Sequence, residues 1–326
     1  VGGIYTVIRS KVPSMVEEWG DNYCLVGPYF PSTAMIEFEP IADLDESPFG
    51  KTVKKMQEMG FDVHYGRWLV TGKPKIVLLD FKALLKNTND YKFKLWERHQ
   101  ISTINTEPLV DQVIALGEMI RVFLTEFGEA FGNKNDILAH FHEWMAASAI
   151  PDLRKDQIKV ATVFTTHATM LGRYLAGNVP NFYDKIHTFD WLKEARHYGI
   201  EAQATLERLA ALQAHVTTTV SDVTAKECEF LLGKVPDLIL PNGLNITRFS
   251  AMHEHQNLHT KYKDRINEFV MGHFFQSQPF NLEKTLYFFT SGRYEYSNKG
   301  YDLTLEALAR LNWKMKQAKI DKTVVM

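Results

Sequence analysis

Short apolar, β-branched runs alternate along most of the chain with longer segments whose apolar residues recur at helical spacing. The short runs predict strands at residues 22–26, 61–65, 75–80, 137–141, 160–165, 215–220 and 238–240. The longer segments predict helices at residues 108–131, 142–150, 169–175, 201–214 and 224–232. Strands separated by helices of this length are typical of an α/β fold with a parallel sheet and right-handed connections.

Two segments give especially clear local signals. Residues 75–80 form a continuous apolar run, which is typical of a strand buried on both faces. Residues 108–131 predict a long helix, with Thr106 as its cap, Pro108 in its first turn and Gly132 at its end.

The pattern starts again near the end of the chain. A charged helix is predicted at about residues 253–272, and it is followed by a strand at 286–290, a helix at 301–316 and the beginning of a strand at 323–326. We therefore expect residues 1–280 to form an N-terminal domain and residues 281–326 to begin a second, truncated domain. Because the chain starts without Met and stops on an apolar run, we expect it to be part of a longer protein.

The composition narrows the class of protein. Of 326 residues, 45% are hydrophobic and 23% charged, which suits a packed core under an ordinary polar surface. Lys and Arg total 37 against 39 Asp and Glu, so no basic excess indicates nucleic-acid binding. No apolar stretch approaches the roughly 18 residues of a membrane helix. The two cysteines cannot build a disulfide framework, which favours a reducing, cytoplasmic location.

Ligands of open α/β sheets bind beyond the carboxyl ends of the strands, so the polar residues there are the candidates for chemistry. His140, His142 and Glu143 lie at the end of one predicted strand. They suit a metal site, acid–base chemistry, hydroxyl binding, or a histidine bonded to backbone. Gly2 and Gly3 precede a predicted helix, where they would let a phosphate approach the backbone or would simply form a turn.

The end of the strand at 160–165 is a sharper candidate. It delivers His167 to the carboxyl edge, and Arg173 follows one to two helical turns later, where its guanidinium could face the same cleft. A helix cap with a surface arginine is the alternative. Asn242 follows the strand at 238–240 and either presents its amide to the cleft or forms an ordinary Asn-Gly turn with Gly243.

Two further groups lie late in the sequence. Arg293 and Lys299 follow the strand at 286–290 and suit a cationic clamp on a diphosphate, with surface salt bridges as the alternative. His253, His255 and His259 resemble a metal motif but lack its spacing, so a solvated helix face is the better interpretation.

Taken together, these segments closely resemble the glycogen synthases of the animal and fungal type, glycosyltransferase family 3. The resemblance covers essentially the whole chain. The blocks that carry it are Val-Gly-Gly-Ile-Tyr-Thr-Val at 1–7, Tyr-Gly-Arg-Trp-Leu at 65–69, His-Phe-His-Glu-Trp at 140–144, Thr-Thr-His-Ala-Thr at 165–169, Leu-Gly-Arg-Tyr-Leu at 171–175, Pro-Asn-Gly-Leu-Asn at 241–245 and Gly-Arg-Tyr-Glu-Tyr with Asn-Lys-Gly across 292–300.

The resemblance implies a GT-B architecture, in which two Rossmann-like domains face a cleft. It also implies retaining transfer of glucose from UDP-glucose to the 4-hydroxyl at the non-reducing end of glycogen, without a metal or other cofactor. The full-length protein would then bind UDP-glucose and an α-1,4-glucan and could form a homo-oligomer, with no nucleic-acid or membrane partner. A non-catalytic glucan-binding or scaffolding homologue and a His-rich metallohydrolase are the alternatives.

The resemblance also implies roles for individual residues. Arg293 and Lys299 would neutralise the departing diphosphate, and Gly2 with Gly3 would lie by the glucosyl phosphate. The catalytic candidates are Arg293, Lys299, His167 and Glu143, and the donor-binding candidates are Gly2, Gly3, Arg173 and Asn242. Because the nucleotide-binding domain would barely have begun by Met326, we expect residues 1–326 alone to bind UDP-glucose poorly and not to turn over.

Overall fold

The computed structural model describes residues 2–42, 44, 46–132, 136–246 and 254–326. Within them the chain separates into two compact units, Val1–Leu244 and Asn245–Met326, called here the first and second unit. The domain boundary expected near residue 280 lies inside the second unit and stays a prediction. None of the helices in the described residues combines the length and apolar character needed to cross a membrane.

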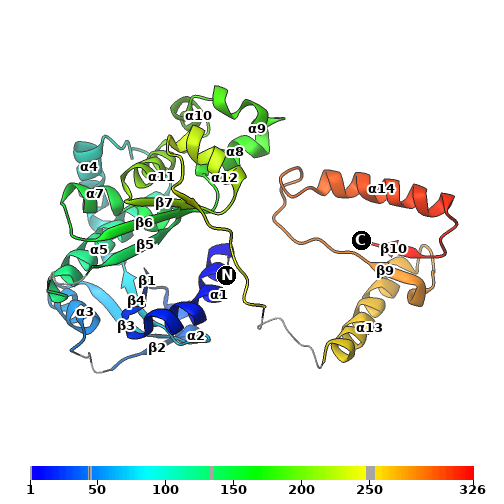
Figure 1. Ribbon diagram of the computed structural model, residues 1–326, viewed down its shortest axis with the longest axis horizontal. Coiled ribbons are helices and arrows are strands. Elements are labelled where there is room, and N and C mark those ends of the chain that lie inside the picture. Colours follow the sequence, from blue (N-terminus) through cyan, green and yellow to red (C-terminus); the bar gives the residue numbers. More distant parts are fainter. Residues whose placement is uncertain (1, 43, 45, 133–135, 247–253) are drawn as a thin grey trace. The chain divides into compact units, whose positions relative to one another are not determined.

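The first unit contains a parallel sheet, as the alternation of strands and helices predicts (Figure 1). Its strands pair in sequence order and all run parallel: β5 (Leu138–His142), β6 (Ala161–Thr166), β7 (Val216–Thr219) and β8 (Leu238–Ile239). The connecting helices are α6 (Glu143–Ala147), α7 (Ile150–Lys155), α8 (Met170–Asn178), α9 (Phe182–Lys185), α10 (Trp191–His197), α11 (Glu201–Gln213) and α12 (Asp222–Glu227). This arrangement confirms the predicted Rossmann-like α/β class.

A second sheet in the first unit departs from the prediction, because it is mixed. Its order is β1 (Cys24–Pro28), β4 (Lys75–Asp80), β3 (Asp62–Trp68) and β2 (Phe38–Pro40). β1 and β4 are parallel, whereas β3 runs antiparallel to both of its neighbours. The expectation of parallel strands is wrong here because only residues 69–74 connect β3 to β4, which is too short for a crossover connection.

Helix α5 (Pro108–Ala130) lies in the core of the first unit. One apolar cluster joins Val77 and Leu79 of β4 to Phe123 of α5 and to Phe141 and Phe164 of the parallel sheet. Pro108 occupies the first turn, as predicted. The expected Thr106 cap is wrong, because the N-cap residue is Glu107 and Thr106 lies one position before it. The Thr106 hydroxyl instead donates to the Thr103 carbonyl at 3.2 Å.

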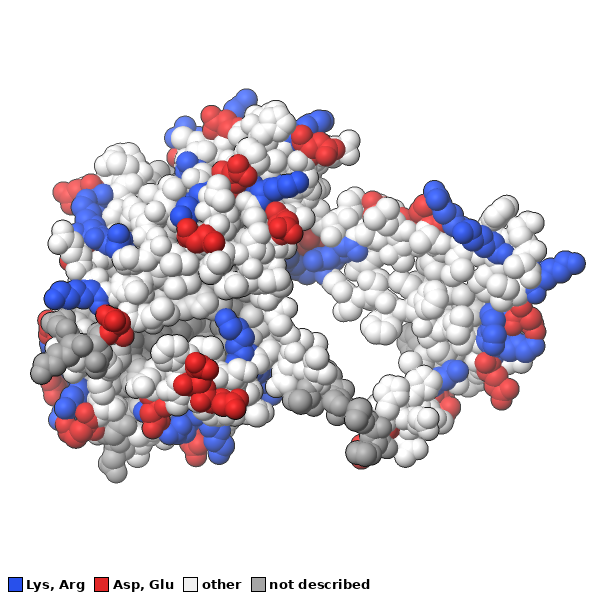
Figure 2. Space-filling view, viewed as in Figure 1, with Lys and Arg blue, Asp and Glu red and all other residues white. Residues whose placement is uncertain are grey.

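Further α-helices of the first unit precede α5 or lie beside the mixed sheet in sequence. They are α1 (Gly3–Trp19), α2 (Pro31–Glu37), α3 (Pro48–Glu58) and α4 (Thr88–His99). The glycine pair lies at the start of a helix, since Gly2 is the extended N-cap residue of α1 and Gly3 is its first residue. Acidic and basic side chains are interspersed over the visible face of this unit (Figure 2), in keeping with the nearly neutral composition.

The second unit is small and repeats the strand–helix–strand pattern that the sequence predicts. Its elements are α13 (His255–Phe274), β9 (Thr285–Tyr287), α14 (Tyr301–Gln317) and β10 (Thr323–Val325). β9 and β10 pair in parallel, with α14 as their connection. His255 and His259 lie on α13, whereas His253 lies outside the described residues.

Candidate active site

Four of the predicted site residues meet at the carboxyl edge of the parallel sheet. β5 and β6 pair with His142 opposite Thr165, so Glu143 and His167, which follow these strands, emerge at the same edge. Arg173 comes from the first turns of α8, and Asn242 follows β8. The amide Nδ2 of Asn242 lies 3.2 Å from His167 Nδ1, and Arg173 Nη2 lies 3.7 Å from Glu143 Oε1.

Glu143 has an unusual backbone for a glutamate. Its φ is +67°, in the left-handed region, and the residue is only 3% exposed. Non-glycine residues held in such conformations cost about 1–3 kcal/mol and cluster at functional sites. Its Oε1 accepts the backbone N–H of His167 at 2.9 Å. Burial raises the pKa of this carboxyl, and the His167 N–H and the Arg173 charge only partly oppose that rise.

His167 lies between two polar partners. Its Nδ1 faces the Asn242 amide, and its Nε2 lies 3.2 Å from His142 Nδ1. Burial, and after it the charges of Lys11 and Arg173, lower the pKa of His167. Lys11 belongs to α1, so that helix lies within electrostatic reach of His167, whereas the assignment of Gly2 and Gly3 to the site stays a prediction.

Residues 167–170 lead from β6 into α8 and are called here the α8 turn. Three glutamates from three elements hold this turn. Glu143 accepts the N–H of His167, Glu227 accepts that of Thr169 at 3.2 Å, and Glu207 accepts that of Met170 at 2.8 Å. The Thr169 side chain also caps α8 by accepting the Gly172 N–H. The helix cap that was one alternative in the sequence is therefore present, and the Arg173 guanidinium lies near Glu143 at the same edge of the sheet.

Sequence reasoning missed Glu207 and Glu227. Glu207 is fully buried on α11, beside Leu206 and Ala210. Its pKa is raised to about 8, chiefly by burial and in part by the nearby carboxylates of Glu143 and Glu227, against the opposing effects of the Met170 N–H and the Arg173 charge. The available signal was an acidic residue on a helix face otherwise rich in Ala and Leu.

His140 and His142 are neutral neighbours within the sheet. Their ring centroids are 4.3 Å apart, and His140 Nε2 lies 2.7 Å from Thr165 Oγ1. Burial is the largest cause that lowers the pKa of His140 to about 4 and that of His142 to about 3. Among the described residues, no three His, Cys, Asp or Glu side chains are arranged to hold a metal ion, so the metal interpretation of this pair gains no support.

The remaining predicted residues lie at the start of α1 and in the second unit. A Cβ on Gly2 or Gly3 would meet nothing within 4 Å, so the backbone there is open to a ligand. Arg293 and Lys299 both lie between β9 and α14, and the Lys299 stem packs beside Gly292. Arg293 Nε also forms a 3.1 Å ion pair with Glu295, so the surface salt bridge that was its alternative is present.

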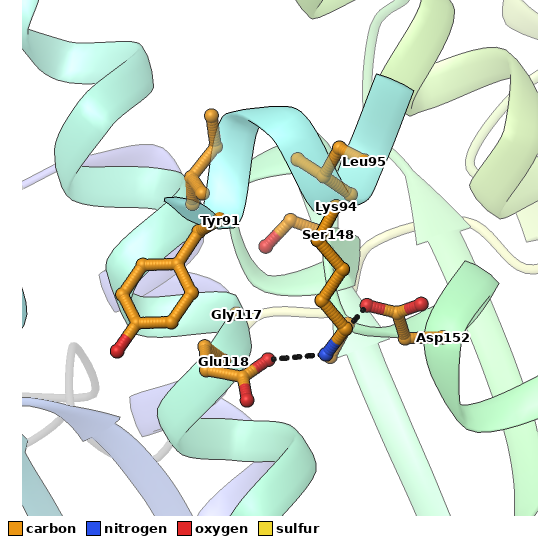
Figure 3. A pocket seen from close by; sticks show the side chains of 9 residues that line it. Tyr91, Lys94, Leu95, Gly117, Glu118, Ser148 and Asp152 are labelled. Atoms are coloured by element: carbon orange, nitrogen blue, oxygen red, sulfur yellow. Dashed lines mark hydrogen bonds and ion pairs between the residues drawn. The ribbon is translucent and has the colours of Figure 1, made fainter. Parts of the chain in front are cut away.

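A small cavity between α4 and α5 is a different kind of site (Figure 3). Its free space of about 20 Å³ suits one water molecule. Lys94 points into it and contacts Glu118 at 3.2 Å and Asp152 at 3.5 Å. These residues belong to what we call the ion-pair network, which consists of Lys94, Arg98, His99, Glu118, Arg121, Asp152 and Asp156. Its charges are already paired with one another, which indicates a structural role.

Comparison with known proteins decides the family. The sequence model of the glycogen synthase family matches residues 1–326. The chain belongs to the glycogen synthase family. This confirms the resemblance found in the sequence, and membership implies the GT-B architecture.

Several members of the family are similar over the entire chain. It is 44% identical to the glycogen [starch] synthase of Neurospora crassa over 325 residues and 45% identical to isoform 1 of Saccharomyces cerevisiae over 334 residues. It is 42% identical to the liver form of Rattus norvegicus over 326 residues. The matches cover 100% of this chain but only 46%, 47% and 46% of these relatives, so the chain spans a little under half of their length.

Proposed function

We propose that the full-length product of this gene is a glycogen synthase that transfers glucose, with retention, from UDP-glucose to the 4-hydroxyl at the non-reducing end of an α-1,4-glucan. The observation that carries the proposal is the match to the family over the whole chain. The geometry supports it, because Glu143, His167, Arg173 and Asn242 meet at one edge of the parallel sheet.

The proposed chemistry needs two kinds of group. Cleavage of the bond to UDP builds positive charge on the sugar and negative charge on the leaving diphosphate, and fixed cations bind that state more strongly than the ground state. We assign the diphosphate to Arg293 and Lys299 and the glucosyl phosphate to Gly2 and Gly3, so that no metal cofactor is needed.

The sugar itself is assigned to the first unit. His167 and Asn242 contact the donor sugar, and Glu143 with Arg173 line the cleft and position donor and acceptor. Glu143 Oε1 already accepts the His167 N–H and faces Arg173, which suits positioning better than covalent attack. Retention then follows from front-face attack assisted by the departing phosphate.

The proposal extends to partners and location. Glycogen and UDP-glucose are the substrates, the full-length product forms a homo-oligomer, and the protein works in the cytoplasm. The thiols of Cys24 and Cys228 are free, which suits a reducing compartment.

The test is transfer of radiolabelled glucose from UDP-glucose to glycogen by the full-length product, with ADP-glucose in parallel. Arg293→Ala should lower kcat by about 100-fold, because a cation aimed at developing charge is lost. Arg310→Ala is the matched control, since Arg310 is an exposed arginine of the same unit that pairs with Glu306 on its own helix at 2.8 Å. Transfer from neither donor would refute the function, and unchanged turnover of Arg293→Ala would refute the clamp.

A further inference from the structure

A chain of three polar side chains crosses the carboxyl edge of the parallel sheet. Asn242 Nδ2 lies 3.2 Å from His167 Nδ1, and His167 Nε2 lies 3.2 Å from His142 Nδ1. An amide nitrogen can only donate, so His167 Nδ1 must be the acceptor of the first contact. A neutral imidazole carries one proton, and this proton must then lie on Nε2 and point at His142.

The surroundings favour the neutral ring. The charged groups that face His167 are Lys11 of α1 and Arg173 of α8, both cationic, and they act with burial to lower the pKa of His167. Glu143 is the adjacent carboxylate, but its Oε1 is bonded to the backbone N–H of His167 rather than to the ring. The neighbouring His142 and His140 are neutral as well, since burial lowers the pKa of His142 to about 3 and that of His140 to about 4.

We propose that His142 is a positioning residue that, together with Asn242, holds the His167 ring in one orientation as the Nε2–H tautomer. Both ring nitrogens of His167 are then occupied within the protein. The ring shapes the site of the donor sugar and does not take the proton of the acceptor hydroxyl. The catalytic part of this inference rests on the proposed function, whereas the tautomer does not.

The position of His142 makes it a suitable anchor. It ends β5, where its backbone pairs with Thr165 of β6, and its ring packs against that of His140 in a tilted arrangement. It also directly precedes Glu143, whose left-handed backbone turns the chain out of the strand. His142 is therefore fixed by the sheet on one side and by a constrained turn on the other, so its Nδ1 is a stable acceptor.

The direct test is nitrogen NMR of the ¹⁵N-histidine-labelled chain at neutral pH, with the His167 signals identified by their loss in His167→Gln. The wild type should show a protonated Nε2 and a bare Nδ1 at His167. His142→Leu removes the acceptor of the Nε2 proton, so the exposed Asn242 amide can rotate and accept from Nδ1–H instead, and the signals should show a mixture of tautomers. His142→Asn places an amide oxygen near the former Nδ1 and should restore the single tautomer. His140→Gln is the matched control and should leave the His167 signals unchanged, because His140 bonds Thr165 instead.

Asn242→Asp tests the other end of the chain and remains informative if His142→Leu does not fold, because Asn242 is exposed. A carboxylate at this position accepts instead of donating, so it should reverse the tautomer and move the proton to Nδ1. A wild-type His167 that is protonated on Nδ1 or on both nitrogens would overturn the inference. So would His167 signals that are indifferent to both His142→Leu and Asn242→Asp.

Kinetics of the full-length product test the catalytic part. His142→Leu should lower kcat/KM for UDP-glucose by about 10- to 100-fold, because small misplacements of a positioned group cost that much. His142→Asn should recover most of the loss. Equal impairment of His142→Leu and His142→Asn would refute the positioning role. If the wild type transfers no glucose but shows the expected tautomer, the proposed function fails while the structural inference stands.

Discussion

The first unit buries carboxylates in two places and treats them in opposite ways. At the α8 turn, Glu143 and Glu207 face backbone N–H groups and one another, and burial raises the pKa of both. In the ion-pair network, burial alone would raise the pKa of Glu118 and that of Asp152. Arg121 and Lys94 instead lower the pKa of Glu118 below its ordinary value. His99, Lys94 and Arg98 do the same for Asp152. The partner, not the depth of burial, decides the charge state.

This difference distinguishes the ion-pair network, which has a structural role, from the α8 turn, whose carboxyl groups have raised pKa values. The network ties α4, α5 and α7 together with charges that satisfy one another (Figure 3). The α8 turn instead keeps a strained backbone at Glu143 and a fully buried carboxyl at Glu207. Such costly features cluster at functional sites, which is consistent with the role proposed for the residues beside His167.

The largest effect should come from breaking the network. Asp152→Asn leaves Lys94, Arg98 and His99 together without the carboxylate that contacts all three. Removing one partner of a buried ion pair costs about 3–5 kcal/mol of unfolding free energy. Urea denaturation measures the loss, and Asp156→Asn, at a more exposed member of the network, should lose less. A loss for Asp152→Asn below about 1 kcal/mol would contradict the structural role.

A pair of glycine substitutions should separate the two regions by activity. A Cβ on Gly172 would lie 2.4 Å from Glu227 Oε2, and a Cβ on Gly117 would lie 2.5 Å from Ser148 Oγ. Each alanine variant should lose about 1–3 kcal/mol of stability through overpacking. Only Gly172→Ala should also lower glucosyl transfer by the full-length product, because it displaces a glutamate that holds the α8 turn. Equal activities of the two folded variants would break the comparison.

The pH dependence of stability should differ in sign between the regions. The pKa of Glu207 rises from 4.5 to about 8 on folding, so its favourable protonated form is fully present below about pH 4.5 and is lost as the pH rises to about 8. Glu207→Gln should therefore be more stable than the wild type above about pH 8, by about 1–2 kcal/mol. Unfolding free energies measured across this range check it, and parallel curves would count against the buried carboxyl.

The Asp152 contribution should behave in the opposite way. Its pKa is lowered from 3.8 on folding, so its stabilising effect is present above that value and is lost as the pH falls through the lowered pKa. Comparing wild type with Asp152→Asn in acid should show the two curves converging. Curves that stay equally far apart would mean that charge is not the cause.

The smallest expected effect comes from Gly128→Ala on α5, the same helix as Gly117. A Cβ there would meet nothing within 4 Å. Alanine should therefore gain about 0.5–1 kcal/mol from its higher helix propensity. A loss in this variant would show that the cost of Gly117→Ala reflects the helix rather than the contact with Ser148.

Part of this picture is visible in the sequence. The segment 75–80 and the polar residues after 137–141 and 160–165 predict both a buried strand and a common site, because carboxyl ends of neighbouring parallel strands meet at one edge. The antiparallel β3 is not visible in this way, since the run at 61–65 gives no direction; the short connection to β4 decides it.

The glutamates behind the site are the larger omission. Glu207 and Glu227 resemble surface residues of amphipathic helices in sequence, and their burial becomes apparent only when α8, α11 and α12 converge. For Arg293 and Lys299 the sequence is more informative than the structure. Sequence resemblance assigns them a role, and the second unit shows that they share one loop, but their action on a substrate stays a prediction.

The left-handed backbone of Glu143 has a consequence for how this protein evolves in the laboratory. Glycine or asparagine adopts that conformation at little cost, and either would also remove a buried carboxyl from position 143. A screen for heat resistance that ignores activity should therefore enrich substitutions at this position, and the recovered variants should be poor catalysts. Position 143 would then be one at which selection for function maintains a residue that lowers the stability of the fold.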